Sequence, residues 1–172
     1  MMKRMYLRTV PFVAVFCTAT AFATAISDGA QLFTPAELLQ KAGEIGAQPR
    51  NHGLAVTTIA TLPGPKMPNE TFAPNSLLLV DRIATGQSEL HQTEHDVYSI
   101  VAGTGTLIVG GEIVGGRKTG ATEIRGDSVK GGTRRRVSAG DVVMVPAGVA
   151  HQMTLDPGAH MTYTVFKALA AR

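Results

Sequence analysis

The sequence predicts an all-β sandwich or barrel preceded by one short helix. From residue 54 onward, the chain consists of short β-branched or apolar runs separated by Gly, Pro and Asn, which is the pattern of strands and turns. A helical pattern occurs before these runs and does not alternate with them, which argues against an α/β fold. The 172 residues suffice for one domain with its own core and, once a leader is removed, are too few for two ordinary domains.

The first 25 residues have the order of a secretory signal peptide. A basic start is followed by an apolar stretch and then by small residues. The apolar stretch is shorter than the roughly 20 residues needed to cross a bilayer, so we expect no permanent membrane anchor. Cleavage is expected after Ala25, with the position after Ala23 as an alternative. The mature protein is therefore expected to be secreted or periplasmic.

Loss of this leader changes what charge and cysteine content imply. The excess of 16 basic over 13 acidic side chains disappears with Lys3, Arg4 and Arg8, which removes the main argument for nucleic-acid binding. The only cysteine, Cys17, also lies in the leader. The mature chain would therefore have no disulfide, no thiolate catalyst and no cysteine-ligated metal. Any metal site must be built from His, carboxylate or water ligands.

Residues 34–46 carry the signals of a helix start. Thr34 is placed as the N-cap, Pro35 stands at the first helical position, and Glu37 completes a capping box. We expect this amphipathic helix to cover an open end of the sheet. The apolar residues expected to face the body of the protein are Leu38, Leu39 and Ile45.

Six later runs are predicted as strands, and one long stretch is not. The runs that fit strands are 54–60, 76–84, 96–103, 104–111, 141–148 and 161–169. The Gly-rich, polar stretch 110–140 favours a long hairpin or an ordered loop between strands. Three consecutive arginines within it, Arg134 to Arg136, are expected at a solvated edge. The alternative is a clamp for an anionic ligand at the barrel mouth.

One turn between predicted strands has a specific spacing. Gly140 is followed after five residues by Pro146, then after one residue by Gly148, and after two more by His151. The first glycine lies in a turn that leads into a buried strand over residues 142–145, and the Pro and the second Gly form the next tight turn. His151 then begins the returning strand with its side chain pointing inward.

This spacing resembles the second sequence motif of the cupin superfamily, although Leu155 stands where that motif usually ends in Asn. The resemblance implies a jelly-roll barrel, also called a double-stranded β-helix, with one short N-terminal helix. It divides the chain into a signal peptide over 1–25, an N-terminal segment containing the helix over 26–53, and a cupin barrel over 54–172.

The first cupin motif is expected within residues 86–103. Asp96 and Gly103 are spaced like the acidic ligand and the closing glycine of the family, with Asp in place of the usual Glu. Glu89 and His91 stand where the family has His, one residue, His. By this resemblance, the metal ligands are Glu89, His91, Asp96 and His151.

Strand periodicity provides a check that does not depend on the resemblance. Side chains two residues apart share a face of a strand, so Glu89 and His91 lie together. Asp96 and Tyr98 share the inward face of the returning strand, whereas His95 points away and is only a reserve ligand. Because Asp is shorter than Glu, Asp96 could instead orient a histidine ligand by a hydrogen bond.

The convergent set of two histidines and two carboxylates suggests a barrel that binds one metal ion and accepts a small organic ligand bearing carboxylate or hydroxyl groups. A mixed nitrogen and oxygen ligand set suits Fe(II), Mn(II), Zn(II), Ni(II) or Co(II). If the protein is an enzyme, Glu89 or Tyr98 could move a proton. The alternative is a metal-free binding or structural barrel without enzymatic activity. A homodimer is expected by analogy with other cupins.

Overall fold

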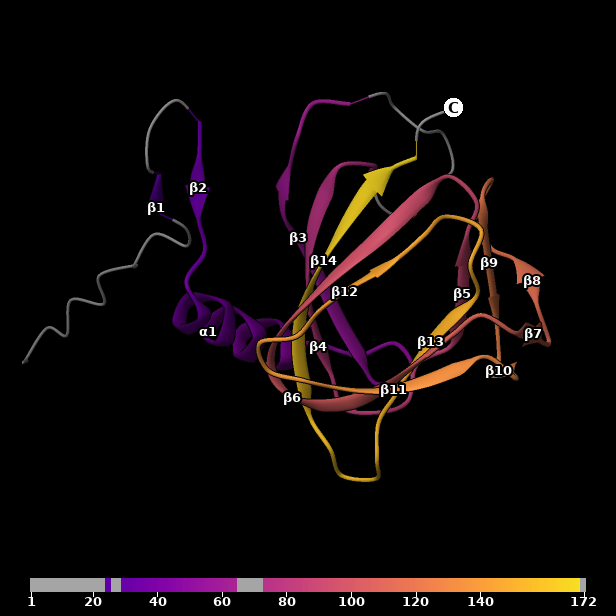
Figure 1. The fold of residues 1–172 in the computed structure, drawn as a ribbon. Coiled ribbons are helices and arrows are strands. Elements are labelled where there is room, and N and C mark those ends of the chain that lie inside the picture. The colour runs from indigo at the N-terminus through magenta and orange to yellow at the C-terminus, as the bar shows by residue number, and fades with distance from the viewer. Residues whose placement is uncertain (1–23, 26–28, 65–72, 171–172) are drawn as a thin grey trace, which may run out of the picture.

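The computed structural model describes residues 24–25, 29–64 and 73–170, and their elements are arranged as in Figure 1. Residues 1–23 of the expected signal peptide lie outside this description, and Thr24–Ala25 form a short strand, β1. The other elements are β2 (Gln31–Leu32), α1 (Pro35–Gly46), β3 (Leu54–Thr61), β4 (Ser76–Arg82), β5 (Ser88–His91), β6 (Glu94–Val109), β7 (Glu112–Val114), β8 (Arg117–Lys118), β9 (Glu123–Gly126), β10 (Ser128–Lys130), β11 (Thr133–Ser138), β12 (Val142–Val145), β13 (His151–Thr154) and β14 (Met161–Leu169).

The main sheet has ten strands, and all of its pairings are antiparallel. Its principal order is β3-β4-β14-β6-β13-β5-β9-β8, and β11 and β12 both pair with β6. The sheet curls into an open barrel, with β6 running across it and α1 on its outer side (Figure 1). The predicted all-β class with one N-terminal helix is confirmed, and the curled antiparallel sheet fits the expected jelly-roll.

Strand β6 corrects one detail of the predicted strand order. The sequence suggests two strands separated at Gly103, but the structure has one strand from Glu94 to Val109. Gly103 lies in this strand at φ 78°, and the pairing register with β14 shifts beside it. A Cβ at Gly103 would lie 2.1 Å from the carbonyl oxygen of His160, so glycine allows the strand to bend here without ending.

Helix α1 begins as predicted, with Thr34 as N-cap and both hydrogen bonds of the capping box to Glu37. Its buried residues are Leu38 and Ala42, which pack with Leu79 on the outer face of β4. Leu39 was expected to face the body but is 43% exposed, because it lies one residue off this stripe. The helix thus packs on an outer face of the sheet and not on an open end.

The turn and strand before His151 have the predicted boundaries but a different burial. Strand β12 was expected to be buried throughout, yet Val142 is 65% exposed and Met144 is 71% exposed. Val145 is buried in the core and Val143 packs against it. The reason is that β12 covers the barrel with one face only and pairs with β6 alone among the described strands.

The interior of the barrel is lined by alternate residues of the long strands. On β4, Leu78 and Val80 belong to the main core, and on β14 Tyr163 and Val165 do so.

None of the helices formed by the described residues is long and apolar enough to span a bilayer.

Asp81 fixes the segment after α1 to the outer face of the sheet. Its buried carboxylate accepts hydrogen bonds from Arg50, from Thr162 at 3.2 Å and from His160 at 2.5 Å. Burial works against ionisation, but the hydrogen bonds from Arg50 and His160 outweigh it and lower the pKa of Asp81.

Asp81→Asn is therefore expected to lower the free energy of unfolding at neutral pH by about 1–3 kcal/mol. The contribution of Asp81 is fully present above the ordinary aspartate pKa of about 3.9 and is lost as the pH falls toward its lower folded value. Urea unfolding of wild type and variant at neutral pH and at about pH 3 checks this. The two curves should converge in acid, and a gap that stays constant with pH would contradict the assignment.

Candidate metal centre and adjoining pocket

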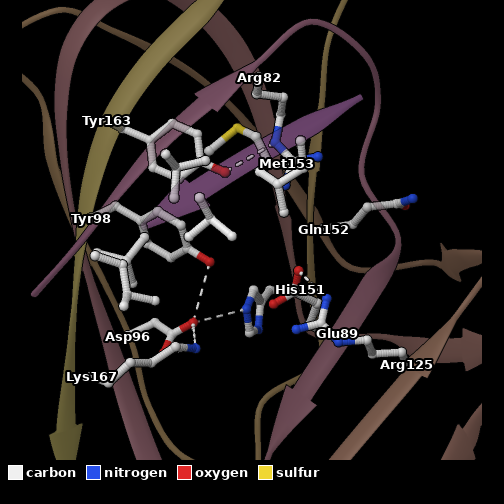
Figure 2. Close-up of a pocket in the computed structure, with 15 residues that line it drawn as sticks. Arg82, Glu89, Asp96, Tyr98, Arg125, His151, Gln152, Met153, Tyr163 and Lys167 are labelled. Atoms are coloured by element: carbon white, nitrogen blue, oxygen red, sulfur yellow. Dashed lines mark hydrogen bonds and ion pairs between the residues drawn. The ribbon is translucent and has the colours of Figure 1, made fainter. Parts of the chain in front are cut away.

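The four predicted ligands come from three neighbouring strands and meet inside the barrel. Strand β5 supplies Glu89 and His91, β6 supplies Asp96, and β13 supplies His151. Glu89 and His151 are direct cross-strand partners. One donor atom from each of the four residues lies within 4.8 Å of all the others. Figure 2 shows Asp96, His151 and Glu89 converging from different strands at one end of the pocket.

The separations between the donor atoms suit a shared ion. His91 Nε2 lies 3.3 Å from Glu89 Oε2 and 3.5 Å from Asp96 Oδ2. His151 Nε2 lies 3.3 Å from the same Asp96 oxygen. Ligands that bind one ion at about 2.0–2.2 Å in tetrahedral or octahedral geometry lie roughly 3.0–3.5 Å from their neighbours. These residues are therefore compatible with binding one divalent metal ion.

The orientation of His151 gives the clearest test of whether the site fits a metal. Its Nδ1 lies 3.1 Å from the carbonyl oxygen of Val149, so Nδ1 carries the hydrogen and donates to it. Its Nε2 is buried and makes no hydrogen bond. Burial alone would lower the pKa of the ring, but contact with Asp96 and the charge of Glu89 outweigh it and raise the pKa of His151, so a metal ion would have to replace a proton at Nε2. Its 3.3 Å contact with the Asp96 carboxylate lacks hydrogen-bond geometry. A metal-binding histidine has this arrangement, with one nitrogen donating to a backbone carbonyl and the other free to bind.

A carboxylate also lies beside the second ring nitrogen of His91. Its Nε2 faces the cluster, whereas its Nδ1 lies 3.7 Å from Glu123 Oε1 on β9. The two residues are cross-strand partners in the β5–β9 pairing. A carboxylate on the far side of the ring would hold the imidazole with Nε2 directed at the cluster.

Lys167 is the residue of the cluster that the sequence analysis did not single out. It is 5% exposed and lies opposite Asp96 in the β6–β14 pairing. Its Nζ lies 2.7 Å from Asp96 Oδ1 and 2.9 Å from Oδ2, and it donates to His91 Nε2 at 2.9 Å. Lys167 and a metal ion therefore need the same lone pair of His91. Asp96 could serve both cations, because Oδ1 faces the lysine and Oδ2 faces the two imidazoles.

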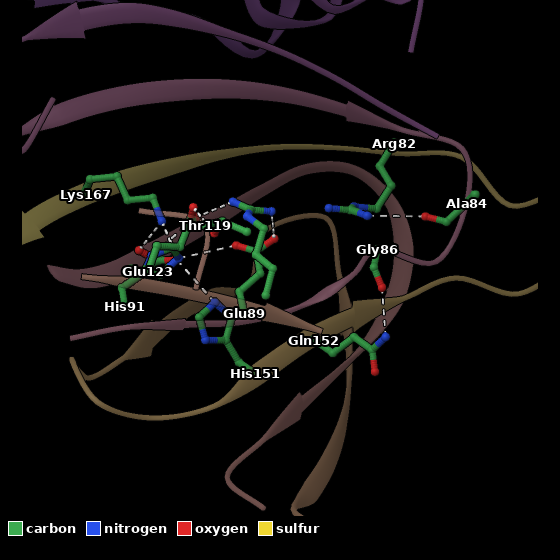
Figure 3. A network of polar contacts seen from close by, with 12 residues as sticks. Arg82, Ala84, Gly86, Glu89, His91, Thr119, Glu123, His151, Gln152 and Lys167 are labelled. Atoms are coloured by element: carbon green, nitrogen blue, oxygen red, sulfur yellow. Dashed lines mark hydrogen bonds and ion pairs between the residues drawn. The ribbon is translucent and has the colours of Figure 1, made fainter. Parts of the chain in front are cut away.

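Arg125 and Glu123 add a second charged group behind the cluster. Arg125 lies opposite Glu89 in the β5–β9 pairing and donates to it at 3.1 Å. The same guanidinium donates to Glu123 at 2.5 Å. Figure 3 shows Glu89 and Glu123 as part of one polar network with His91 and Lys167. Both new residues lie in the Gly-rich stretch, whose short strands pair antiparallel as β7 with β10 and β8 with β9, as in the expected long hairpin.

Electrostatics keep the two carboxylates of the cluster ionised. Burial opposes this, but contact with His151 and the charge of Lys167 lower the pKa of Asp96 to about 2. For Glu89, burial is likewise outweighed by the contact with His91 and the charge of Arg125, which hold its pKa well below the ordinary value. Both residues can therefore act as anionic ligands without first losing a proton.

Tyr98 lies on the inward face of β6, as predicted from strand periodicity. Its hydroxyl donates to Asp96 Oδ2 at 3.3 Å. Burial and the charges of Asp96 and Glu89 raise the pKa of Tyr98 well above its ordinary value, so the hydroxyl keeps its proton. In this environment Tyr98 can donate a hydrogen bond but is a poor base, and Glu89, with its lowered pKa, is also a weak base.

The other histidines and the arginine run lie away from the cluster. His95 points out of the barrel, as expected, and accepts a hydrogen bond from the backbone N–H of Ala147 at 3.0 Å. His160 contacts Asp81 on the outer face. The run Arg134 to Arg136 lies exposed on β11, and Arg136 donates to Asp156 at 3.0 Å. None of these residues lines the pocket beside the cluster.

A cavity of about 50 Å³ adjoins the four ligands. About 10–15 Å³ of such space holds one water, so the cavity accommodates a small polar group or a few waters. The wall is apolar toward β3, β4 and β14 and charged toward the cluster, with two tyrosine rings between (Figure 2). The charged side chains of the wall are Arg82, Glu89, Asp96, Arg125 and Lys167.

No protein-family model matches the sequence, and no curated protein matches it. Similar solved structures include the plu4264 protein from Photorhabdus luminescens, with 11% identity over 69% of this chain and 77% of that chain and a TM-score of 0.43. KdgF from Halomonas sp. has 17% identity over 73% of this chain and 87% of that chain, with a TM-score of 0.43. A Cupin 2 conserved barrel domain protein from Salinispora arenicola has 20% identity over 69% of this chain and 77% of that chain, with a TM-score of 0.42. The function proposed below rests on this chain's own residues.

Proposed function

We propose that the barrel binds one divalent metal ion through Glu89, His91, Asp96 and His151, and that the adjoining pocket takes a small organic ligand. The observation that carries this proposal is the buried Nε2 of His151, which makes no hydrogen bond and points at three other donors within 4.8 Å. The mixed nitrogen and oxygen set suits Fe(II), Mn(II), Zn(II), Ni(II) or Co(II). When bound, the ion would act as a Lewis acid toward a carboxylate or hydroxyl oxygen of the ligand.

A metal-free binding barrel is the second candidate, and Lys167 favours it. The ammonium group already donates to His91 Nε2 and Asp96 Oδ2, and it lies 2.7 Å from Asp96 Oδ1. In this alternative, lysine supplies the positive charge that the carboxylates need, and the pocket binds its ligand without an ion. The two candidates differ in whether Lys167 leaves His91 when a metal is offered.

Metal analysis of purified protein after reconstitution tests the proposal. We expect one equivalent of metal in the wild type and a large loss of affinity, about 100-fold or more, in Glu89→Ala and in His151→Ala. His95→Ala is the matched control, because His95 is the reserve ligand and points away from the cluster. If all four proteins hold the same small fraction of metal, the metal proposal is wrong.

A chelator separates the two candidates by a second route. An ion that binds only the folded state stabilises it by RT ln(1 + [L]/Kd), so its removal should lower the melting temperature of the wild type. The melting temperature of His151→Ala should not respond. An unchanged melting temperature of the reconstituted wild type with chelator would favour the metal-free barrel.

For a catalytic role, we propose a division of labour between Tyr98 and Glu89. Tyr98 would donate a proton or hydrogen bond to the ligand, because its hydroxyl is buried beside Asp96 and stays protonated. Glu89 would serve mainly as a metal ligand, because Arg125 and His91 hold it ionised. Turnover that survives Tyr98→Phe would contradict this role once a substrate is known.

Two further proposals follow from the sequence. The chain would be exported, and mass spectrometry of the mature N-terminus would show whether cleavage occurs after Ala25 or Ala23.

The protein would also form a homodimer, in which a second copy covers exposed Val142 and Met144 on β12. A monomer in analytical ultracentrifugation would contradict the second proposal.

A further inference from the structure

Arg82 is a buried cation in the wall of the pocket. It lies at the end of β4, two and four residues after Val80 and Leu78, and therefore shares their inward face. The residue is only 4% exposed. It lines the cavity beside the metal ligands and also a second cavity of about 30 Å³, which is bordered by exposed Asn51 and His52. Arg82 thus lies where the two cavities adjoin.

The guanidinium makes no direct ion pair within the described part of the chain, and the charge of Glu89 acts on it only from a distance. Its Nε donates to the Tyr163 hydroxyl at 3.0 Å, and Nη1 lies 3.4 Å from the carbonyl oxygen of Ala84. Both acceptors are neutral, and no carboxylate lies within 4.0 Å among the residues that the structure describes. Of its five N–H donors, the chain engages two.

The other two cations of the pocket wall are different in this respect. Arg125 is paired with Glu89 and Glu123, and Lys167 is paired with Asp96. A buried charge without a partner is costly, because burial removes its hydration. An incoming anion would therefore bind at Arg82, where it would replace the hydration that the guanidinium loses on burial and accept hydrogen bonds from its unused N–H groups.

Gly86 leaves the space that this guanidinium needs. A Cβ at Gly86 would lie 2.1 Å from Arg82 Nη1 and 2.7 Å from Cζ. The backbone around Gly86 is fixed by hydrogen bonds, since its N–H donates to Met153 O at 3.0 Å and its carbonyl accepts from Gln152 at 2.8 Å (Figure 3). The backbone of an alanine at this position could not shift away, so the Arg82 guanidinium would have to move.

We propose that Arg82 binds the carboxylate of the ligand, at the end of the pocket away from the metal ligands' shared centre. A planar carboxylate matches the fork of the guanidinium, and its short apolar chain would lie against Leu54, Val80 and Val165. A second oxygen of the natural ligand would reach the ion, and only this part rests on the proposed function. The substrate class is therefore a small carboxylic acid with a second oxygen function.

Titration calorimetry with butyrate and butyramide tests this inference. The two probes have nearly the same shape but differ in charge, and chelator-treated protein removes any contribution from a metal. We expect the wild type to bind butyrate at least about tenfold more tightly than butyramide, as a charged hydrogen bond in a buried site allows. Arg82→Met should bring the two affinities together, and Arg82→Lys should keep part of the preference.

Arg136→Met is the matched control, because Arg136 is an exposed arginine outside the pocket and should leave the preference unchanged. If Arg82→Met does not fold, Gly86→Ala is the second variant, because it displaces the guanidinium and retains all charges. Loss of its preference for butyrate over butyramide would support the inference. Equal affinities of the two probes in the wild type would overturn it. Tighter binding of inorganic phosphate than of butyrate would overturn the assignment to carboxylates.

Metal content measured in the same samples separates this inference from the proposed function. If the wild type binds no metal but prefers butyrate through Arg82, the metal proposal fails and the anion site stands. If the wild type binds one equivalent of metal but does not distinguish the probes, the anion site is wrong and the metal proposal stands.

Discussion

Asp96→Asn should lower the free energy of unfolding of chelator-treated protein by about 3–5 kcal/mol. The Asp96 side chain is almost fully buried, and so is the Lys167 ammonium 2.7 Å from it. Removing the carboxylate charge would leave a buried cation with no anionic partner in direct contact, since the remaining partner is the His91 ring. Urea unfolding monitored by circular dichroism gives the difference, and the chelator keeps loss of a metal ligand out of the comparison.

The double variant Asp96→Asn/Lys167→Met provides the control for this effect. With both charges removed, most of the lost stability should return, because no unpaired charge stays in the interior. The exposed pair of Arg136 and Asp156 is a matched comparison, and breaking it by Asp156→Asn should cost less than about 1 kcal/mol. A single Asp96→Asn variant as stable as the wild type would show that the buried pair is not formed.

Lys167→Met should raise the metal affinity of the barrel by at least about tenfold, because it removes a positive charge close to the ion. In the structure the ammonium is bound to His91 Nε2, so an incoming ion must first displace it. The variant gives that lone pair to the metal and leaves Asp96 Oδ2 facing the two imidazoles. Competition with a fluorescent chelator measures the affinity of both proteins for Zn(II) and Mn(II).

The outcome also distinguishes the two candidate functions. If Lys167 is the permanent counter-ion of a metal-free barrel, the Lys167→Met protein should lose stability and still fail to bind metal. Its remaining carboxylates, Glu89 and Asp96, would then be buried with one cation fewer. Reduced metal affinity of the Lys167→Met protein would contradict competition between Lys167 and the ion for His91. It would indicate instead that Lys167 holds the Asp96 carboxylate in position for the ion.

The sequence was sufficient to locate the four proposed ligands because two short motifs carry fixed spacings. His151 follows a turn whose Gly and Pro positions define where the returning strand begins, and Asp96 is placed by its distance from Gly103. Period-two alternation then predicted that Glu89 and His91 share a face, which the 3.3 Å contact between them confirms. The same alternation correctly directed His95 away from the cluster.

Arg82 and Lys167 could have been found by that alternation, although they were not singled out. Arg82 continues the inward series of Leu78 and Val80, and Lys167 continues that of Tyr163 and Val165. A long charged residue in an inward series is a signal for a buried polar site.

Arg125 and Glu123 gave no comparable signal. They lie in a Gly-rich stretch without clear periodicity, and their place opposite Glu89 and His91 depends on the β5–β9 register. That register joins segments more than 30 residues apart and is set by the folded sheet. The exposure of Leu39 and Met144 was missed for a related reason, since the side of a helix or strand that faces solvent depends on which other elements cover it.

A crystal structure of the metal-reconstituted protein, with anomalous diffraction measured at the absorption edge of the metal, decides most directly whether the four side chains share an ion. We expect one anomalous peak inside the barrel, about 2.0–2.2 Å from Glu89, His91, Asp96 and His151, with the Lys167 ammonium withdrawn from His91. A map with no peak there, and with Lys167 still bound to His91 Nε2 at saturating metal, would contradict it.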